Sequence, residues 1–185
     1  LQIVGSIDLA VNKLELDSRK VVANDVFFAI KGTLSDGHQF IEKAISLGAK
    51  VIVCEVLPTQ ISNDVTYILV KNSHAALAFM AANFFENPSY NLELVGVTGT
   101  NGKTTIASLL YQLFENAGFK VGLISTVKIM VHNQEFVATH TTPDSVTIHK
   151  FLALMVDEGV DYCFMEVSSH GIHQKRTEGL LFRGG

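Results

Sequence analysis

Apolar residues in the first half of the chain follow two periodicities, which alternate. Short runs rich in β-branched and aromatic residues, at 26–30, 51–54 and 67–70, predict buried strands. Residues 39–47 and 73–85 instead carry apolar side chains at helical spacing and predict amphipathic helices. Strands that alternate with helices in this way predict an α/β fold built on a parallel sheet.

Polar residues at 86–89, with Pro88 among them, interrupt this alternation. Proline disfavours a helical conformation at the residue before it, so we expect a domain boundary near this point. We therefore predict one domain over residues 1–88 and another over 89–185. In the second domain the pattern predicts strands at 92–98, 121–125 and 162–167, helices at 103–117 and 142–158, and a hairpin within 126–137.

Composition excludes several classes of protein. The formal net charge of −4 lacks the basic excess with which a bulk-charge nucleic-acid binder displaces phosphate counterions. With 48% hydrophobic residues the chain can bury a core, yet no apolar run reaches the length of a membrane span. Cys54 and Cys163 lie in apolar runs far apart, which favours buried free thiols in a reducing cytoplasm. We expect no nucleic-acid partner, no membrane partner and a cytoplasmic location.

The most informative segment, residues 96–105, reads GVTGTNGKTT and lies between a predicted strand and a strongly periodic helix. This is the context of a phosphate-binding loop, in which backbone N–H groups converge on phosphate oxygens at a helix N-terminus. Lys103 can reach the β- and γ-phosphates of a nucleotide, and the Thr104 hydroxyl can ligate Mg²⁺. The general pattern G-x-x-x-x-G-K-[ST] requires its first glycine where this chain has Val97, whereas the glycine stands one residue earlier, at Gly96.

At this point the residues resemble a known family. TGTNGKTT after a Val-Gly-Val strand resembles the Mur ligases, the ATP-dependent amide-bond ligases of peptidoglycan precursor synthesis. The MurE type, which adds the third amino acid, is similar in further segments: LDSR at 16–19, DVFFAIKG at 25–32, DGH at 36–38, HTTPD at 140–144, and MEVSSHG at 165–171 followed by Gln174 and Arg176. The resemblance covers essentially the whole chain. It implies a bacterial protein with a small UDP-substrate-binding α/β domain followed by an incomplete P-loop ATPase-type parallel-sheet domain.

The resemblance implies a reaction in which ATP phosphorylates the D-Glu γ-carboxylate of UDP-N-acetylmuramoyl-L-alanyl-D-glutamate. The amine of an incoming amino acid then attacks the acyl phosphate, and phosphate leaves. Because the carboxylate and the γ-phosphate repel each other, the site needs Mg²⁺ and cationic groups. The implied catalytic residues are Lys103, Glu166 and His170, and the implied Mg²⁺ ligands are Thr104 and Glu166. The implied ATP-binding residues are Gly99, Thr100, Asn101, Gly102, Lys103, Thr104 and Thr105.

The resemblance also implies contacts with the UDP-linked substrate. Leu16 and Ser18 match its uridine-diphosphate contacts, and Thr33, Leu34 and Ser35 lie where the family has a second contact loop.

Contacts with the dipeptide are implied in the second domain. Arg176 suits an anion, because a guanidinium binds carboxylate or phosphate in a bidentate way. Thr142 also suits a second task as N-cap of the helix predicted over 142–158, with Pro143 at its first position. The implied dipeptide contacts are His140, Thr141, Thr142, Ser168, Gln174 and Arg176.

The family pattern extends beyond the residues of this sequence. A carbamylated lysine that binds a second Mg²⁺ in the family, and the C-terminal domain that takes the incoming amino acid, have no counterpart here. We therefore expect an amino-terminal fragment of the parent ligase, without turnover of its own. Two alternatives remain open: a stand-alone nucleotide-binding module of the same fold, and a folylpolyglutamate-synthase-like ligase, which the first domain disfavours.

Overall fold

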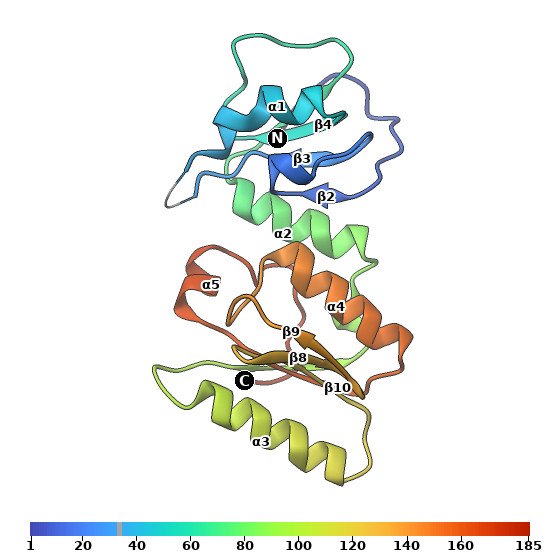
Figure 1. The fold of residues 1–185 in the computed structure, drawn as a ribbon, viewed down its shortest axis with the longest axis vertical. Helices are drawn as coiled ribbons and strands as arrows, with labels where there is room; N and C mark the ends of the chain where they lie inside the picture. The colour runs from blue at the N-terminus through green and yellow to red at the C-terminus, as the bar shows by residue number, and fades with distance from the viewer. Residues whose placement is uncertain (33–34) are drawn as a thin grey trace. The chain divides into compact units, whose positions relative to one another are not determined.

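A computed structural model describes residues 1–32 and 35–185 of the chain, which divide into two compact units, Leu1–Leu77 and Ala78–Gly185. The division falls inside helix α2 (Ser73–Phe84). The domain boundary near position 88 stays a prediction. Each unit is built on a five-stranded sheet of its own (Figure 1).

The first unit orders its strands β1-β5-β4-β3-β2. Strands β2 to β5 are mutually parallel, whereas β1 pairs antiparallel with β5. Phe27, Ile52 and Tyr67 are buried in one core with Ile41 and Ala44 of α1. The elements are β1 (Gln2–Val4), β2 (Leu14–Glu15), η1 (Ser18–Lys20), β3 (Val26–Phe28), η2 (Gly37–Phe40), α1 (Ile41–Ser46), β4 (Val51–Cys54) and β5 (Thr66–Leu69).

The Asp36-Gly37-His38 segment stabilises this unit through the hydrogen bonds of the His38 ring. The His38 ring bridges two chain segments: its Nδ1 lies 2.6 Å from Asp36 Oδ1, and its Nε2 accepts from the Glu55 amide at 3.0 Å. The Glu55 carboxylate in turn accepts from the Ser73 amide at 2.7 Å, which lowers the pKa of Glu55. Glu55, which follows β4, is thereby hydrogen-bonded to Ser73 at the start of α2.

The second unit orders its strands β6-β10-β7-β8-β9. The first three are parallel, while β8 and β9 form an antiparallel hairpin beside β7. Helix α3 covers one face of this sheet and α4 covers the other (Figure 1). The elements are η3 (Pro88–Tyr90), β6 (Glu93–Val97), α3 (Lys103–Asn116), β7 (Val121–Ile124), β8 (Lys128–Val131), β9 (Gln134–Val137), α4 (Ser145–Asp157), β10 (Tyr162–Glu166) and α5 (Ser169–His173).

Buried residues of β10 alternate between the two faces of this sheet. Phe164 packs with Ala107 and Tyr111 of α3, whereas Cys163 and Met165 pack in the core that includes α4. A strand covered on both faces shows a continuous apolar run in its sequence, as β10 does. The predicted α/β fold with parallel sheets is thereby confirmed.

Helix α4 begins later than its sequence pattern predicts. Asp144 is the N-cap, and its carboxylate accepts from the Thr147 amide at 3.0 Å and from the Thr147 hydroxyl at 2.7 Å. The expectation that Thr142 caps this helix and that Pro143 begins it is therefore wrong. The physical reason is that Asp144 supplies a stronger, charged acceptor for the first turn.

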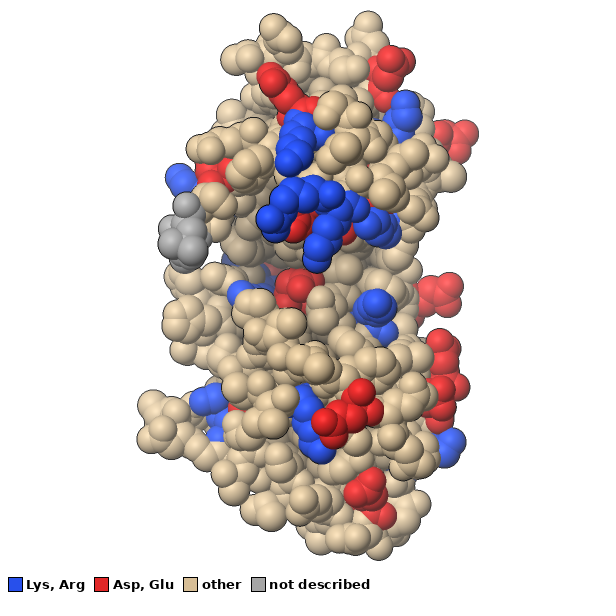
Figure 2. All heavy atoms as spheres, viewed as in Figure 1, with Lys and Arg blue, Asp and Glu red and all other residues tan. Residues whose placement is uncertain are grey.

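Charge is unevenly distributed on the molecular surface. On the face shown in Figure 2, several basic side chains form one cluster over the first unit, which also carries acidic side chains, and both signs are scattered over the second. Within the described ranges, no helix combines the length and apolar character needed to cross a bilayer.

Candidate active site

Three parallel strands of the second unit end at the same edge of the sheet, because β6, β10 and β7 are neighbours. After β6 comes the glycine-rich loop at 98–102, after β7 come Ser125 and Thr126, and Glu166 is the last residue of β10. Open parallel sheets bind their ligands outside the carboxyl ends of the strands. The fold therefore brings the predicted loop and the predicted carboxylate to the edge where a ligand is expected.

The glycine-rich loop owes its shape to two residues with positive φ. Gly99 has φ 144°, and Gly102, in the left-handed conformation, is the N-cap of α3. Lys103 turns back over the loop, and its Nζ donates to the Gly99 carbonyl at 2.8 Å and to the Thr100 carbonyl at 3.5 Å. The first-turn N–H groups of α3 have no acceptors within the helix. A lysine beside the positive end of a 14-residue helix is a suitable site for phosphate.

The Glu166 side chain is completely buried at the end of β10. Its Oε2 accepts from the Thr104 hydroxyl at 3.0 Å and from the Thr126 hydroxyl at 3.2 Å. Its Oε1 accepts from the Thr126 backbone N–H at 2.8 Å. Burial of an unpartnered carboxylate is costly, so these three donors are what allows Glu166 to occupy this position.

The oxygens of Thr104 and Glu166 fit a magnesium ion. Thr104 Oγ1 and Glu166 Oε2 lie 3.0 Å apart. Adjacent ligands of an octahedral Mg²⁺ with bonds of about 2.1 Å are separated by about 3 Å. Mg²⁺ in nucleotide sites takes one or two protein oxygens and completes its shell with phosphate and water. No group of three or more His, Cys, Asp or Glu in the described part of the chain could hold a metal, so the ion would depend on such added ligands.

A second predicted group of residues surrounds Thr142. The Thr142 hydroxyl donates to the Glu166 carbonyl and accepts from the Ser168 amide, both at 2.9 Å. The Ser168 hydroxyl caps α5 by accepting from the Gly171 amide at 3.0 Å. At Gly171 even a methyl group would lie only 2.7 Å from Thr142 Cγ2. Hydrogen bonds and close packing therefore connect the segment before α4 to the turn after β10.

Arg176 joins the same network from the turn that follows α5. Its guanidinium donates to the Thr142 carbonyl through Nη1 and to Gln174 Oε1 through Nε at 3.0 Å. Burial lowers the pKa of Arg176, and the charge of Asp144 acts in the opposite direction. An arginine keeps its charge in proteins, so a partly buried cation lies beside the predicted dipeptide contacts.

The remaining predicted residues of this unit lie nearer to solvent. Thr141 Oγ1 is 3.1 Å from the Thr126 hydroxyl, which links Thr141 to the Glu166 network. His140 is exposed, with its Nδ1 3.1 Å from Thr139 Oγ1. His170 is exposed on α5.

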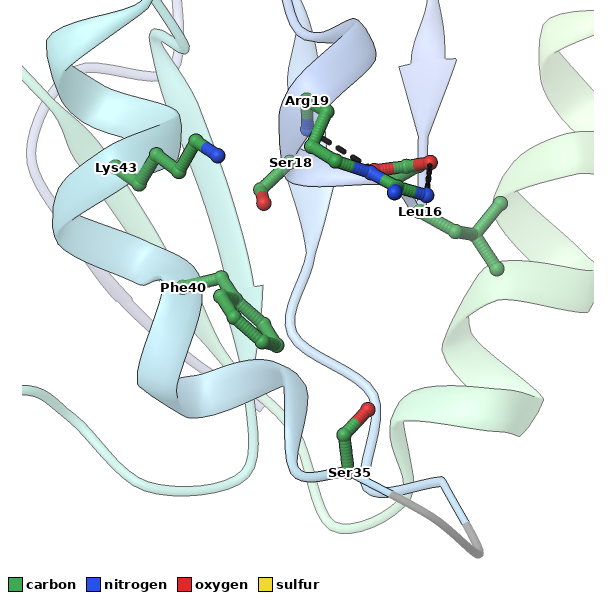
Figure 3. A pocket seen from close by; sticks show the side chains of 7 residues that line it. Leu16, Ser18, Arg19, Ser35, Phe40 and Lys43 are labelled. Carbon is green, nitrogen blue, oxygen red and sulfur yellow. Dashed lines mark hydrogen bonds and ion pairs between the residues drawn. The ribbon is translucent and has the colours of Figure 1, made fainter.

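In the first unit, three predicted residues line a cavity of about 500 Å³ (Figure 3). They are Leu16, Ser18 and Ser35, whereas Thr33 and Leu34 lie outside the described residues. Sequence reasoning did not place four further lining residues in the site: Asp17, Arg19, Phe40 and Lys43.

The missed residues give this cavity its charge. Arg19 forms a bidentate pair with Asp17, with nitrogen–oxygen distances of 2.9 Å and 2.7 Å, and its hydrogen bonds lower the pKa of Asp17 to about 2. Lys43 extends from α1 toward the same space, and the Phe40 ring lies below it (Figure 3). Arg19 could have been found from its position next to Ser18. Lys43 could not, because only the fold brings α1 beside η1.

Family models match both parts of the chain. The Mur ligase family catalytic-domain model matches residues 10–85, and the Mur ligase middle-domain model matches residues 97–184. This chain belongs to the Mur ligase family. The general phosphate-loop pattern has a glycine where this chain has Val97. The match to the middle-domain model nevertheless begins at Val97 and includes the whole loop.

Curated Mur ligases are similar over the whole chain. The UDP-N-acetylmuramoyl-L-alanyl-D-glutamate–2,6-diaminopimelate ligase of Bacteroides fragilis is 50% identical over 100% of this chain and 38% of its own length. The ligase of the same name from Clostridium tetani is 48% identical over 98% of this chain and 38% of its own length. The chain thus spans a little over a third of the length of these relatives.

Solved structures of Mur ligases share the fold. A UDP-N-acetylmuramoyl-L-alanyl-D-glutamate–2,6-diaminopimelate ligase gives a TM-score of 0.75 at 24% identity, covering 94% of this chain and 36% of that structure. The MurF ligase from Thermotoga maritima in complex with ADP gives a TM-score of 0.56 at 29% identity, covering 89% of this chain and 34% of that structure. Both likenesses place the two α/β units of this chain within the Mur ligase architecture.

Proposed function

We propose that this chain carries the nucleotide site and the UDP-substrate site of an ATP-dependent, ADP-forming ligase of peptidoglycan precursor synthesis. The ligase joins an amino acid to UDP-N-acetylmuramoyl-L-alanyl-D-glutamate, and we infer that it works in the bacterial cytoplasm. The observation that carries this proposal is the pair of oxygens on Thr104 and Glu166, next to Lys103 on a glycine-rich loop. The names of the similar curated proteins give 2,6-diaminopimelate as the amino acid that they add.

The loop binds the nucleotide through residues 99–105 in this proposal. The Lys103 ammonium exchanges its Gly99 and Thr100 carbonyl partners for oxygens of the β- and γ-phosphates. The hydroxyl of Thr104 and the carboxylate of Glu166 would hold Mg²⁺. When bound, this ion offsets the repulsion between the γ-phosphate and the substrate carboxylate.

The substrate meets the chain at two places in this proposal. In the first unit, Lys43 and the Arg19 N–H groups that Asp17 leaves free provide donors and positive charge for a diphosphate. Leu16, Ser18 and Ser35 line the cavity and contact the uridine diphosphate in this proposal, with Thr33 and Leu34 as further predicted contacts. In the second unit, the Arg176 guanidinium faces the D-Glu carboxylates with N–H groups that Thr142 and Gln174 leave free. The other dipeptide contacts are His140, Thr141 and Ser168, and His170 supports the phosphate.

Calorimetry with Mg²⁺ and ADP tests the nucleotide site. The wild-type chain should bind, and Lys103→Met should weaken binding about tenfold or more, because a charge-assisted hydrogen bond is lost. Lys150→Met removes an exposed lysine of α4 and serves as the matched control, with affinity unchanged. A wild-type chain that fails to bind, or a Lys103→Met chain that binds equally well, rejects the proposal.

A phosphate-release assay tests what the chain does by itself. With the UDP-linked dipeptide, ATP and 2,6-diaminopimelate, we expect nucleotide binding without phosphate release. Turnover at the rate of a full-length relative would show that the chain contains the whole catalytic machinery.

A further inference from the structure

Most of the hydrogen bonds to the Glu166 carboxylate are donated by Thr126, a residue that belongs to none of the sequence motifs described above. Of the three hydrogen bonds that the carboxylate accepts, two are donated by Thr126, one through the backbone N–H at 2.8 Å and one through the hydroxyl at 3.2 Å. Thr126 follows Ser125 in the turn between β7 and β8, and it is exposed although Glu166 is completely buried. The residue therefore covers the buried carboxylate on its solvent side.

The Thr126 hydroxyl has a second neighbour on the opposite side. Its oxygen lies 3.1 Å from the Thr141 hydroxyl, in the segment that leads to α4. A hydroxyl has one proton to donate and two lone pairs to accept with. When Thr126 donates its single proton to Glu166, a hydrogen bond between the two threonine hydroxyls must be donated by Thr141. With Thr126 donating to Glu166, the hydrogen bonds run from Thr141 through Thr126 to Glu166.

We propose that Thr126 is a positioning residue that fixes the Glu166 carboxylate for Mg²⁺ and connects it to Thr141 on the substrate side. This inference rests on the proposed function, since it assigns Thr126 to the same cation site. The backbone N–H holds Oε1, and the hydroxyl shares Oε2 with Thr104. Residues that orient a metal ligand commonly change metal affinity by about 10- to 100-fold when they are removed.

Thr126 contacts Glu166 in two separate ways, through its backbone N–H and through its hydroxyl. The backbone N–H remains when Thr126 is replaced by Val, Ser or Ala, so these substitutions test the side chain and its hydroxyl. Thr126→Val keeps the shape of the side chain and removes its O–H, whereas Thr126→Ser keeps the O–H and removes a methyl group. Thr59 provides a control, because it is exposed in the first unit and Thr59→Val removes a hydroxyl far from Glu166 in the sequence.

The experiment measures ADP binding by the full chain at increasing Mg²⁺ concentration, and again in EDTA. For Thr126→Val we expect the Mg²⁺ concentration at half-maximal effect to rise about tenfold, with binding in EDTA unchanged. Thr126→Ser should restore the wild-type Mg²⁺ dependence to within about threefold, and Thr59→Val should match the wild type. Thr126→Ala, which removes the hydroxyl without adding a second methyl group, is expected to behave like Thr126→Val.

The alternative is a hydroxyl that only stabilises the fold. In that case Thr126→Val and Thr126→Ala melt at lower temperature while their Mg²⁺ dependence stays that of the wild type, and the inference is overturned. Failure of Thr126→Ser to restore the Mg²⁺ dependence overturns it as well. A wild-type chain that binds no Mg²⁺ and ADP refutes the proposed function first, and with it the role of Thr126.

Discussion

Replacing His149 with leucine should stabilise the second unit, most strongly at acidic pH. His149 lies on α4, and its side chain is completely buried. Neither ring nitrogen has a hydrogen-bond partner among the described residues. Burial lowers the pKa of His149 to about 4, because the charged imidazolium loses its hydration.

The sign and size of the effect follow from proton linkage. Between about pH 4 and pH 6.5 the unfolded chain binds a proton at His149 that the folded chain does not, so the free energy of unfolding falls as the pH falls. The free energy of unfolding falls by about 1.4 kcal/mol for each pH unit in this window, which amounts to about 2 kcal/mol between pH 6.5 and pH 5. Leucine has a similar volume and does not titrate. It also removes two unsatisfied nitrogens, which cost about 1–3 kcal/mol each when buried without partners.

Urea unfolding at pH 7.5 and pH 5.0, followed by circular dichroism, measures this difference. The loss of unfolding free energy between the two pH values should be about 2 kcal/mol smaller in His149→Leu than in the wild type. His173→Leu is the matched control, because His173 is exposed on α5 and its removal should leave the pH dependence unchanged. Equal losses in His149→Leu and the wild type would show that His149 has a partner that compensates its burial.

Three further substitutions test other parts of the second unit. Gly122→Ala would place a methyl group 2.5 Å from the Sδ of the fully buried Met155, so we expect a loss of about 1–3 kcal/mol in urea unfolding; an unchanged midpoint would show that Met155 can move aside. Asp144→Ala removes the N-cap of α4 and should cost about 1 kcal/mol, measured in the same way, with Asp144→Asn close to the wild type. Gly171→Ala should push Thr142 away and weaken binding of the UDP-linked dipeptide about tenfold in calorimetry without changing ADP affinity; equal loss of both affinities would indicate general unfolding.

Local sequence patterns were sufficient to predict the positions of the helices and strands whose apolar residues recur with a strong periodicity. The strand at β10, the helix at α3 and the β8–β9 hairpin all lie within a few residues of their predicted positions. The strands β1 and β2 were missed, since runs of three and two residues are too short to show an alternation. The start of α4 was misplaced because Thr142 and Asp144 both suit an N-cap, and only the fold gives Thr142 another partner.

Long-range contacts limited what could be predicted of the candidate site. Lys103 and Thr104 follow from one contiguous pattern, and Glu166 follows from its position at a strand end. Thr126 carries no such signal, because the turn that presents it is 40 positions from Glu166 in the sequence. Only the neighbouring arrangement of β7 and β10 brings the two residues together.

The strand order of the second sheet has a consequence for how the protein is made. Strand β10 lies between β6 and β7, although it is the last of the three to leave the ribosome. Until it arrives, β6 has no parallel neighbour, and a chain growing from its N-terminus cannot complete the sheet. The same strand delivers Glu166 to the Thr104 hydroxyl, 62 positions earlier in the chain. The strand insertion that joins β6 to β7 therefore also brings Glu166 beside Thr104, so a nascent chain would acquire this part of its core and the two proposed cation ligands in a single folding event.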